Sequence, residues 1–399
     1  MSNSATKTTT LAISGGTPVR DSWLPYGRQT INEADIQAVV NVLRGDWLTQ
    51  GPSIAEFEKV VADVCEVKHG VAVNTGTAAL HVAYYGAGVE AGDEVVMPGM
   101  SFAATANAAL YLGAKPVFAD INPGTGSIDV ESARKAITSK TKALVAVDFS
   151  GQPCEMEKLR ALATQKQLVF IVDGAHSLGA RYKGRPAAQF ADLTTFSFHP
   201  VKSITTGEGG MIVTNNDEFA HRMRIFRTHG IEKDASRFVN ENHGAWYHEM
   251  QDLGYNYRIT DFQAALGTSQ MKRLGEFLKR REEIAAHYRA EIASMKHFKT
   301  LSKVEGAESA NHLFPIFTNP ESRKFVVDAL HKENIGVQIH YIPIYRHPYY
   351  EKNVCPVAPD CPNTQRFYEQ IINLPIFPQM TQADARDVVE ALRKVDAAL

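Results

Sequence analysis

The chain has 399 residues but only four cysteines, Cys65, Cys154, Cys355 and Cys361, and no Cys-x-x-Cys pair. Zinc sites usually combine two closely spaced pairs of Cys or His, and the pair formed by Cys355 and Cys361 has no counterpart. We therefore expect no metal site. The four cysteines are interpreted as free thiols of a protein in a reducing cytoplasm.

Long apolar runs and a strong excess of one charge are also missing. No run approaches the roughly 20 apolar residues that a membrane helix needs, and the N-terminus lacks the basic start and apolar stretch of a signal peptide. The formal net charge is -2, which argues against nucleic-acid binding by the overall field but leaves room for an anionic small substrate. We expect a cytoplasmic protein that binds neither membrane nor nucleic acid.

Neither a P-loop nor a Gly-x-Gly-x-x-Gly motif occurs, so nothing directly supports ATP or NAD binding. Instead, short apolar runs alternate with helical patterns from Gly70 onward, as in "GVAVN", "DEVVMPG" and "LVFIVDGA". Strands of consecutive apolar residues are typical of a parallel sheet with helices on both faces. Two further strands flank the stretch from 199 to 209, and this connection is too short for a crossover helix, which favours a hairpin.

The chain is predicted to fold in three parts. A flexible arm covers residues 1–14, and a large α/β domain covers residues 15–265. A long helix from Asp261 to about Ile292 then leads into a small α+β domain over residues 266–399. The switch from βα alternation to a helix rich in Ala, Leu, Lys, Arg and Glu marks the boundary.

Ligands of a doubly wound sheet bind at the carboxyl ends of its strands, so the residues after each strand are the candidates. Gly76 and Thr77 follow the first strand; this turn either holds a phosphate through backbone N–H groups or is an ordinary turn with a capping Thr. Asp173 ends another strand, with His176 three residues later. It is either a helix cap or a carboxylate that faces a cationic ring nitrogen.

The third candidate is Lys202, which lies between Ser197 on a strand and the glycine-rich "TTGEGG". A lysine becomes a nucleophile when burial or a nearby cation lowers its pKa, and a turn at the rim of a buried sheet can provide that. Asn256, just before the long helix, belongs by itself to a linker. A phosphate turn, a strand-end aspartate and a lysine in a glycine-rich turn are together the parts that pyridoxal phosphate needs.

The sequence resembles the DegT/DnrJ/EryC1/StrS family of sugar-nucleotide aminotransferases from about Gly15 to the C-terminus. The resemblance rests on several motifs in the family's order, among them "LTQGPSIAEFE", "VDGAHSLGA", "SFHPVKSITTGEGGMIVTNN", "RTHG" and "GYNYRITDFQAALG". It implies the α/β fold-type I aminotransferase architecture, with a mostly parallel seven-stranded sheet and a small C-terminal α+β domain. It also implies pyridoxal 5'-phosphate as cofactor and a homodimer with shared active sites.

The resemblance implies a role for each matching position. Lys202 matches the lysine that holds the cofactor as an imine, and Asp173 matches the carboxylate that pairs with the pyridine nitrogen. Because some family members that perform dehydration carry His in place of this lysine, Lys202 argues against that branch. The other implied cofactor contacts are Gly76, Thr77 and Ser197 around the phosphate, Phe102 on the ring, His176 near the ring hydroxyl and Asn256 from the partner subunit.

Within the family, "DWLTQGP", "VAVDFSGQP", "NHLFPI" and "GVQIHYIPIY" resemble the C4 aminotransferases of pseudaminic acid biosynthesis. That subgroup implies L-glutamate as donor and a UDP-linked 2-acetamido-2,6-dideoxy-4-ketohexose as acceptor. Thr49, Gln50, His340 and Tyr341 either bind this substrate or simply pack.

Two alternatives stay open at this point. One is transfer to a dTDP- or GDP-linked keto sugar at C3 or C4. The other is a non-catalytic regulator that binds the cofactor without catalysing transfer.

Overall fold

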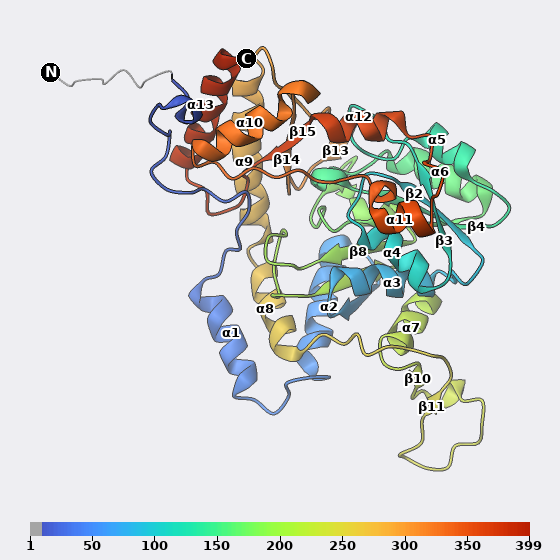
Figure 1. The fold of residues 1–399 in the computed structure, drawn as a ribbon. Coiled ribbons are helices and arrows are strands. Elements are labelled where there is room, and N and C mark those ends of the chain that lie inside the picture. The colour runs from blue at the N-terminus through green and yellow to red at the C-terminus, as the bar shows by residue number, and fades with distance from the viewer. Residues whose placement is uncertain (1–9) are drawn as a thin grey trace.

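The computed structural model describes residues 10–399, and a seven-stranded sheet forms the centre of its larger part (Figure 1). The strand order is β1-β9-β8-β5-β4-β2-β3, and only β9 runs against the others. This confirms the predicted α/β fold-type I architecture with a mostly parallel seven-stranded sheet. The strands are β1 (His69–Val73), β2 (Glu94–Pro98), β3 (Lys115–Ala119), β4 (Thr141–Val147), β5 (Val169–Asp173), β8 (Leu193–Ser197) and β9 (Gly210–Thr214).

Helices bury both faces of this sheet, which explains why its strands carry consecutive apolar residues. In β2, Val95 and Met97 belong to one apolar cluster with α3 and α4, whereas Val96 belongs to the cluster on the opposite face with α5 and α6. The helices around the sheet are α2 (Pro52–Cys65), α3 (Gly76–Gly86), α4 (Ala104–Tyr111), α5 (Val130–Ala136), α6 (Met156–Lys166) and α7 (Asp217–Phe226).

The predicted hairpin around residues 199–209 is present, because β8 and β9 pair antiparallel with Ser197 opposite Gly210. Two glycines in and next to this connection are required by the backbone itself. Gly207 has a φ of +79°, and a Cβ at Gly210 would lie 2.4 Å from the carbonyl oxygen of Thr75. The start of β9 therefore packs directly against the turn that precedes α3, and a side chain at position 210 would separate them.

The C-terminal part contains a small antiparallel sheet in the order β12-β14-β15, covered by helices (Figure 1). Ile316 and Ile372 of this sheet join one apolar cluster with Val388 of the C-terminal helix. The elements are α9 (Leu274–Ile292), β12 (Lys299–Thr300), β14 (Phe314–Phe317), α10 (Pro320–Lys332), α11 (Pro348–Asn353), α12 (Pro362–Gln370), β15 (Ile371–Leu374) and α13 (Gln382–Ala398).

The prediction of one long helix from Asp261 to about Ile292 is wrong in one respect, because this stretch forms two helices. α8 (Asp261–Met271) ends before α9 begins, and the predicted domain boundary at residues 265/266 falls within α8. α8 packs on α2 and α1 (Glu33–Leu43), whereas α9 packs on α13. Arg273, at the break, binds Asp35 of α1. The two helices pack against different neighbours, and the poor helix former Gly275 lies directly after the break.

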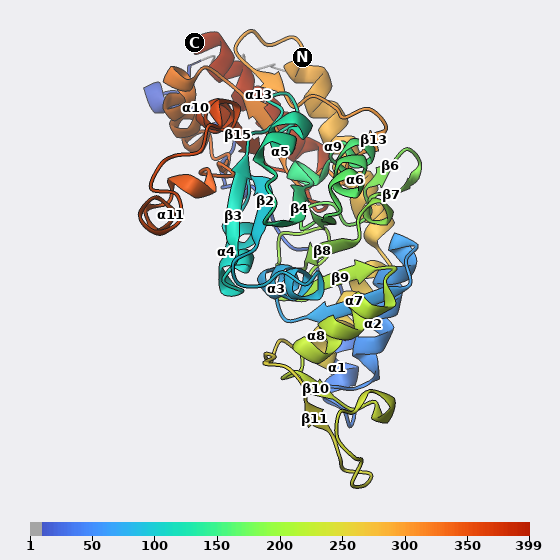
Figure 2. The same ribbon diagram turned by 90° about the vertical axis from the view of Figure 1, so that its right-hand side faces the viewer.

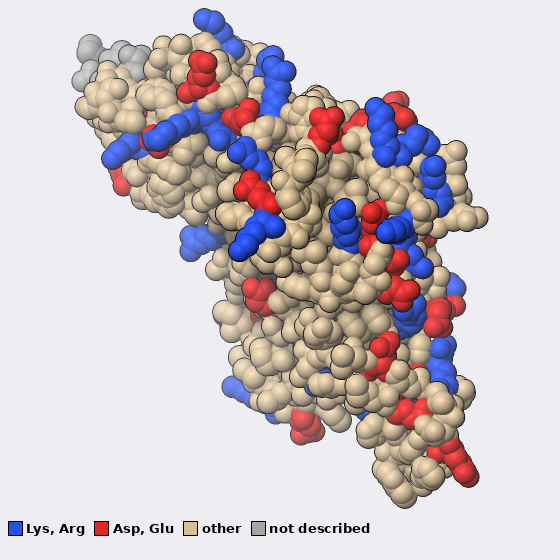
Figure 3. Space-filling view, turned by 45° about the vertical axis from the view of Figure 1, so that its right-hand side comes forward, with Lys and Arg blue, Asp and Glu red and all other residues tan. Residues whose placement is uncertain are grey.

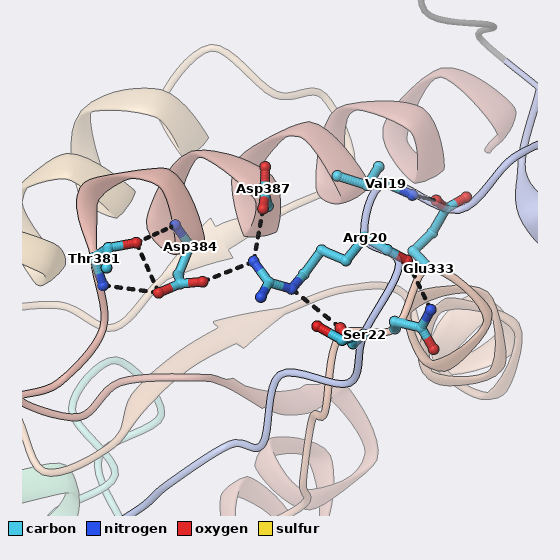
Figure 4. Close-up of polar contacts among 8 residues, drawn as sticks. Val19, Arg20, Ser22, Glu333, Thr381, Asp384 and Asp387 are labelled. Carbon is cyan, nitrogen blue, oxygen red and sulfur yellow. Dashed lines mark hydrogen bonds and ion pairs between the residues drawn. The ribbon is translucent and has the colours of Figure 1, made fainter. Parts of the chain in front are cut away.

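The segment that precedes α1 lies against the C-terminal part, as the close-up in Figure 4 shows. Glu333 accepts hydrogen bonds from the N–H groups of Ala12 (2.8 Å) and Val19 (2.7 Å) and pairs with Lys394 at 2.7 Å. We call these four residues the N-terminal clamp. Next to it, Arg20 binds two carboxylates of α13 at 2.7 Å each, Asp384 and Asp387.

The predicted flexible arm over residues 1–14 lies partly outside the described residues, which begin at residue 10. Residues 12–14 form a 3-10 turn, and Leu11 is buried in the C-terminal apolar cluster. Backbone bonds to Glu333 and this apolar contact hold the segment on the protein.

A hairpin projects from the larger part, at the end far from the C-terminal helices (Figure 2). It contains β10 (Ile231–Glu232) and β11 (Glu249–Met250).

Figure 3 shows acidic and basic side chains interspersed on the face that it draws. None of the helices within residues 10–399 combines the length and hydropathy that crossing a bilayer requires. A three-stranded sheet of β6 (Arg181–Tyr182), β7 (Arg185–Pro186) and β13 (Ala307–Glu308) completes the fold.

Candidate active site

A cavity of about 470 Å³ lies at the carboxyl ends of the parallel strands. The turns after β1, β5 and β8 form one side, and segments from the C-terminal part form the other. This is where a doubly wound sheet presents free backbone groups to a ligand. The lining residues used below are Tyr26, Thr75, Gly76, Thr77, Phe102, Asp173, His176, Ser197, Lys202, His312, His340 and Tyr341.

The N-terminus of α3 forms one end of the cavity. Thr75 is its N-cap and accepts a hydrogen bond from the N–H of Ala78 at 3.0 Å. The N–H groups of Gly76 and Thr77 precede the first bonds of the helix and have no partner within it. A Cβ at Gly76 would lie 2.7 Å from Cβ of Ser197, so only glycine leaves this space open. The turn suits an anion such as a phosphate.

Asp173 ends β5 as a buried carboxylate facing the cavity. Thr105 donates its hydroxyl to Oδ2 at 2.7 Å, and the N–H of Ala175 donates to Oδ1 at 3.2 Å. Burial raises the pKa of Asp173, while these donors and the Lys202 amine act in the opposite direction. Two donors and a nearby cation make the carboxylate a suitable partner for a protonated ring nitrogen.

Lys202 follows β8 in a turn closed by its own N–H, which donates to the carbonyl of His199 at 2.9 Å. Burial lowers the pKa of Lys202 to about 8, the charge of Asp173 opposes this, and the charge of Arg281 adds to it. A substantial fraction of the amine is therefore neutral near physiological pH. A neutral amine next to a buried carboxylate is the state that forms an imine with an aldehyde.

Three histidines, His176, His312 and His340, also line the cavity. The rings of His176 and His312 lie 4.4 Å apart between centroids, and the Tyr341 hydroxyl lies 3.2 Å from Nε2 of His176. The Nδ1 atoms of all three histidines are buried and have no hydrogen-bond partner within residues 10–399. Burial lowers the pKa of His340 to about 4 and moves the pKa values of the other two well below 6.5, so the three rings are neutral.

Most of the predicted site residues meet in this cavity. Phe102 at its mouth is 59% exposed, which leaves its ring free to cover a flat ligand. Nine predicted residues line the cavity: Gly76, Thr77, Phe102, Asp173, His176, Ser197, Lys202, His340 and Tyr341. Their individual roles stay predictions.

Three predicted residues do not line the cavity of the single chain: Thr49, Gln50 and Asn256 are all exposed. Thr49 pairs with Thr260 at the start of α8, close to the turn that Asp261 holds. Asn256 pairs with Thr228. A partner subunit is required if these residues contact a ligand in the cavity, as the resemblance implies for Asn256.

Sequence reasoning missed His312, Thr105 and Tyr26. The only signal for His312 was its place in "NHLFPI", because a lone histidine far along the chain carries no geometric information. Thr105 lies in the first turn of the alanine-rich helix α4, and nothing in this local pattern indicates that its hydroxyl binds Asp173. A second hydroxyl supports it, since Ser101 lies 2.7 Å from Thr105 Oγ1 and is the donor there once Thr105 donates to Asp173.

Comparison with known proteins agrees with this geometry. The sequence pattern of the DegT/DnrJ/EryC1/StrS aminotransferase family matches residues 29–393. The chain belongs to this family. It is therefore a sugar-nucleotide aminotransferase of the DegT family, and family members and structural neighbours depend on pyridoxal phosphate.

Several relatives match the chain over nearly its whole length. The spore coat polysaccharide biosynthesis protein SpsC of Bacillus subtilis is 39% identical and covers 94% of this chain and 98% of its own length. A UDP-4-amino-4,6-dideoxy-N-acetyl-beta-L-altrosamine transaminase of Campylobacter jejuni is 36% identical over 92% and 96%. The structure of Helicobacter pylori PseC, an aminotransferase of pseudaminic acid biosynthesis, superimposes with a TM-score of 0.88 at 32% identity, over 95% and 100%.

The residues that line the cavity fit pyridoxal phosphate. It offers a helix N-terminus kept open by Gly76 for the phosphate and a buried carboxylate for the ring nitrogen. A lysine of lowered pKa is available for the aldehyde, and Nδ1 of His176 is a buried polar atom that has no partner in the part of the chain that the structure describes. Each polar part of the cofactor thus has a group of matching chemistry in the cavity.

Proposed function

We propose that this aminotransferase moves the amino group of L-glutamate to C4 of a UDP-linked 2-acetamido-2,6-dideoxy-4-ketohexose. The product would be an amino sugar nucleotide used in a bacterial surface sugar such as pseudaminic acid. The observation that carries the reaction type is the convergence of Lys202, Asp173 and the open N-terminus of α3 in one cavity. The sugar is proposed from the relatives, since a Campylobacter jejuni and a Helicobacter pylori protein are each named as a UDP-4-amino-4,6-dideoxy-N-acetyl-beta-L-altrosamine transaminase.

Each residue has a definite task in this proposal. The N–H groups of Gly76 and Thr77 and the hydroxyl of Ser197 bind the phosphate, and charge-assisted bonds of this kind are about twice as strong as neutral ones. Bound pyridoxal phosphate supplies an electron sink and carries the amino group between the two substrates. Asp173 would keep a proton on the ring nitrogen of the bound cofactor.

Lys202 has two tasks. Its Nζ would hold the bound cofactor, and the same atom would act as general base and then as general acid for the proton on the α-carbon of the amino donor. A pKa of about 8 suits this double task, because the amine accepts and returns a proton near neutral pH. His176 and Phe102, which line the cavity, would orient the bound cofactor.

We also propose that two copies of the chain share their active sites. Trp47, Leu48 and Leu253 are each about half exposed or more, and they lie near the predicted residues Thr49, Gln50 and Asn256 in the sequence. Apolar side chains grouped with unassigned polar ones are typical of an interface. In a dimer, Asn256 would reach the phosphate of the partner's cofactor.

A second acceptor remains a candidate, because SpsC, at 39% identity, is named for a spore coat polysaccharide and not for this sugar. The purified protein is assayed with L-glutamate and a panel of UDP-, dTDP- and GDP-linked 3-keto and 4-keto sugars. We expect the highest kcat/KM with the UDP-linked 2-acetamido-4-ketohexose. A higher kcat/KM with a dTDP- or GDP-linked sugar would show that this sugar, and not the UDP-linked one, is the acceptor. If no amino group were transferred from glutamate to any of these sugars, the result would favour a non-catalytic regulator that only binds the cofactor.

A further inference from the structure

Arg281 is a buried cation that no carboxylate of the described residues neutralises. It lies on α9 and is 1% exposed. Its neighbours on the same helix, Arg280 and Arg289, each pair with a glutamate. Arg281 forms no ion pair within residues 10–399. Burying a charge in this way is costly, so the position is a candidate for a functional role.

The guanidinium of Arg281 is held by backbone carbonyl groups instead. Nη1 donates to the carbonyls of Ile376 at 2.8 Å, His312 at 3.2 Å and Asn311 at 3.3 Å, and Nη2 donates to Val201 at 3.5 Å. These carbonyls come from three separate segments. One is the lysine turn, one carries the histidine that lies against His176, and the third leads to α13.

The contact with Val201 brings this charge to the residue next to Lys202. Burial lowers the pKa of Arg281 to about 10, so the side chain stays charged at neutral pH. Carbonyl oxygens carry only partial charges, and the field of the guanidinium therefore persists at the lysine amine. It acts in the same direction as burial, which is the larger cause of the lowered Lys202 pKa.

We propose that Arg281 is a positioning residue for Lys202: it ties the lysine turn to the His312 segment and keeps an uncompensated positive charge beside the lysine amine. The consequence is that more of the amine is neutral at a given pH. This inference rests on the proposed function of Lys202, and it adds a residue from the C-terminal part to the reaction.

The other groups around the lysine do not replace this charge. Asp173 favours the protonated amine, and burial keeps the neighbouring histidines neutral. Within residues 10–399, the titratable groups that line the cavity with Lys202 are Tyr26, Asp173, His176, His199, Glu208, His312, His340 and Tyr341. None of them is an arginine or a second lysine.

The test measures the reactivity of Lys202 in the full chain without cofactor. Acetic anhydride labels neutral amines, and mass spectrometry of the peptide containing Lys202 follows the labelling from pH 6 to pH 11. Arg281→Gln removes the charge but keeps amide donors, and Arg281→Lys restores the charge. Arg280→Gln is the matched control, because Arg280 bonds to Met380 and Glu283 and not to the lysine turn.

The wild-type midpoint is expected near pH 8. Arg281→Gln should move it upward by about one pH unit, since a removed like charge favours protonation. At pH 8 this corresponds to about fivefold slower labelling. Arg281→Lys and Arg280→Gln should keep the wild-type midpoint. An unchanged midpoint in Arg281→Gln, or an equal shift in Arg280→Gln, would overturn the proposal.

A second measurement covers the case in which Arg281→Gln does not fold. Arg281→Lys keeps the charge but loses the planar guanidinium, whose two terminal nitrogens bond to four carbonyls. The lysine turn is then held less firmly, so amide hydrogen exchange in residues 199–204 should be faster than in Arg280→Lys. Equal exchange in the two variants would contradict the positioning role. Neither measurement uses a cofactor or a sugar. A failed sugar assay would therefore refute the proposed acceptor but would not affect the conclusion about Arg281.

Discussion

The N-terminal clamp and the cavity are both buried and polar, but they differ in how completely their groups are paired. In the clamp, Glu333 is fully buried and accepts from two backbone N–H groups and from Lys394. In the cavity, three histidine Nδ1 atoms have no partner within residues 10–399. A completed network stabilises the native state, whereas an incomplete one is set up for groups that arrive later.

The same contrast appears in the position of the charges. The clamp joins a carboxylate and an ammonium at 2.7 Å, and so neutralises both. The cavity keeps Lys202 and Asp173 under burial that disfavours the charge of each, with the pKa of the lysine lowered to about 8. Perturbed groups without full compensation are expected where chemistry takes place. Mutations in the two regions should therefore affect different quantities.

The largest effect is expected for Lys202→Ala. Amino transfer should fall by at least about 10³-fold, because the general acid–base group is removed. The melting temperature should hardly change, since the lysine makes no ion pair within residues 10–399 that folding depends on. Lys324→Ala, an exposed lysine on α10, serves as the control and should transfer at the wild-type rate. Normal turnover by Lys202→Ala would show that another group does this work.

Glu333→Gln should show the opposite pattern. The change leaves the Lys394 ammonium buried without its anion, which should lower the free energy of unfolding by about 3–5 kcal/mol in urea denaturation. Cofactor binding per folded molecule should not change, because the clamp is remote from the cavity lining.

The matched control for the clamp is Asp328→Asn, which breaks the exposed Lys324–Asp328 pair on α10. This loss should cost at most about 1 kcal/mol. If the Glu333 and Asp328 variants lost the same stability, the clamp would be no stronger than a surface pair, and the contrast with the cavity would fail.

The sheet, and the gathering of several candidate residues at one edge of it, could be predicted from the sequence for a common physical reason. Runs of buried apolar residues define parallel strands, and the carboxyl ends of parallel strands share one edge. Gly76, Asp173 and Ser197 each follow or end such a strand, so their convergence could be expected before the structure was known. Lys202 joined them because a hairpin of β8 and β9 places its turn at the same edge.

The missed features depend on contacts between residues distant in the chain. His312 meets His176 only because the C-terminal part folds back over the sheet. The break between α8 and α9 accompanies their different packing partners, and Gly275 directly after it is only a weak local sign of it. Likewise, Glu333 binds Val19 across 314 positions of sequence. Local periodicity and capping preferences contain no information about such pairs.

The most direct test of the account is a chemical one. The purified protein, loaded with pyridoxal phosphate, is reduced with borohydride, digested and analysed by peptide mass spectrometry, with and without prior L-glutamate. The account predicts a cofactor adduct on the peptide containing Lys202 that glutamate prevents, because the amino donor frees the lysine first. An adduct on a different lysine, or none at all, would contradict it.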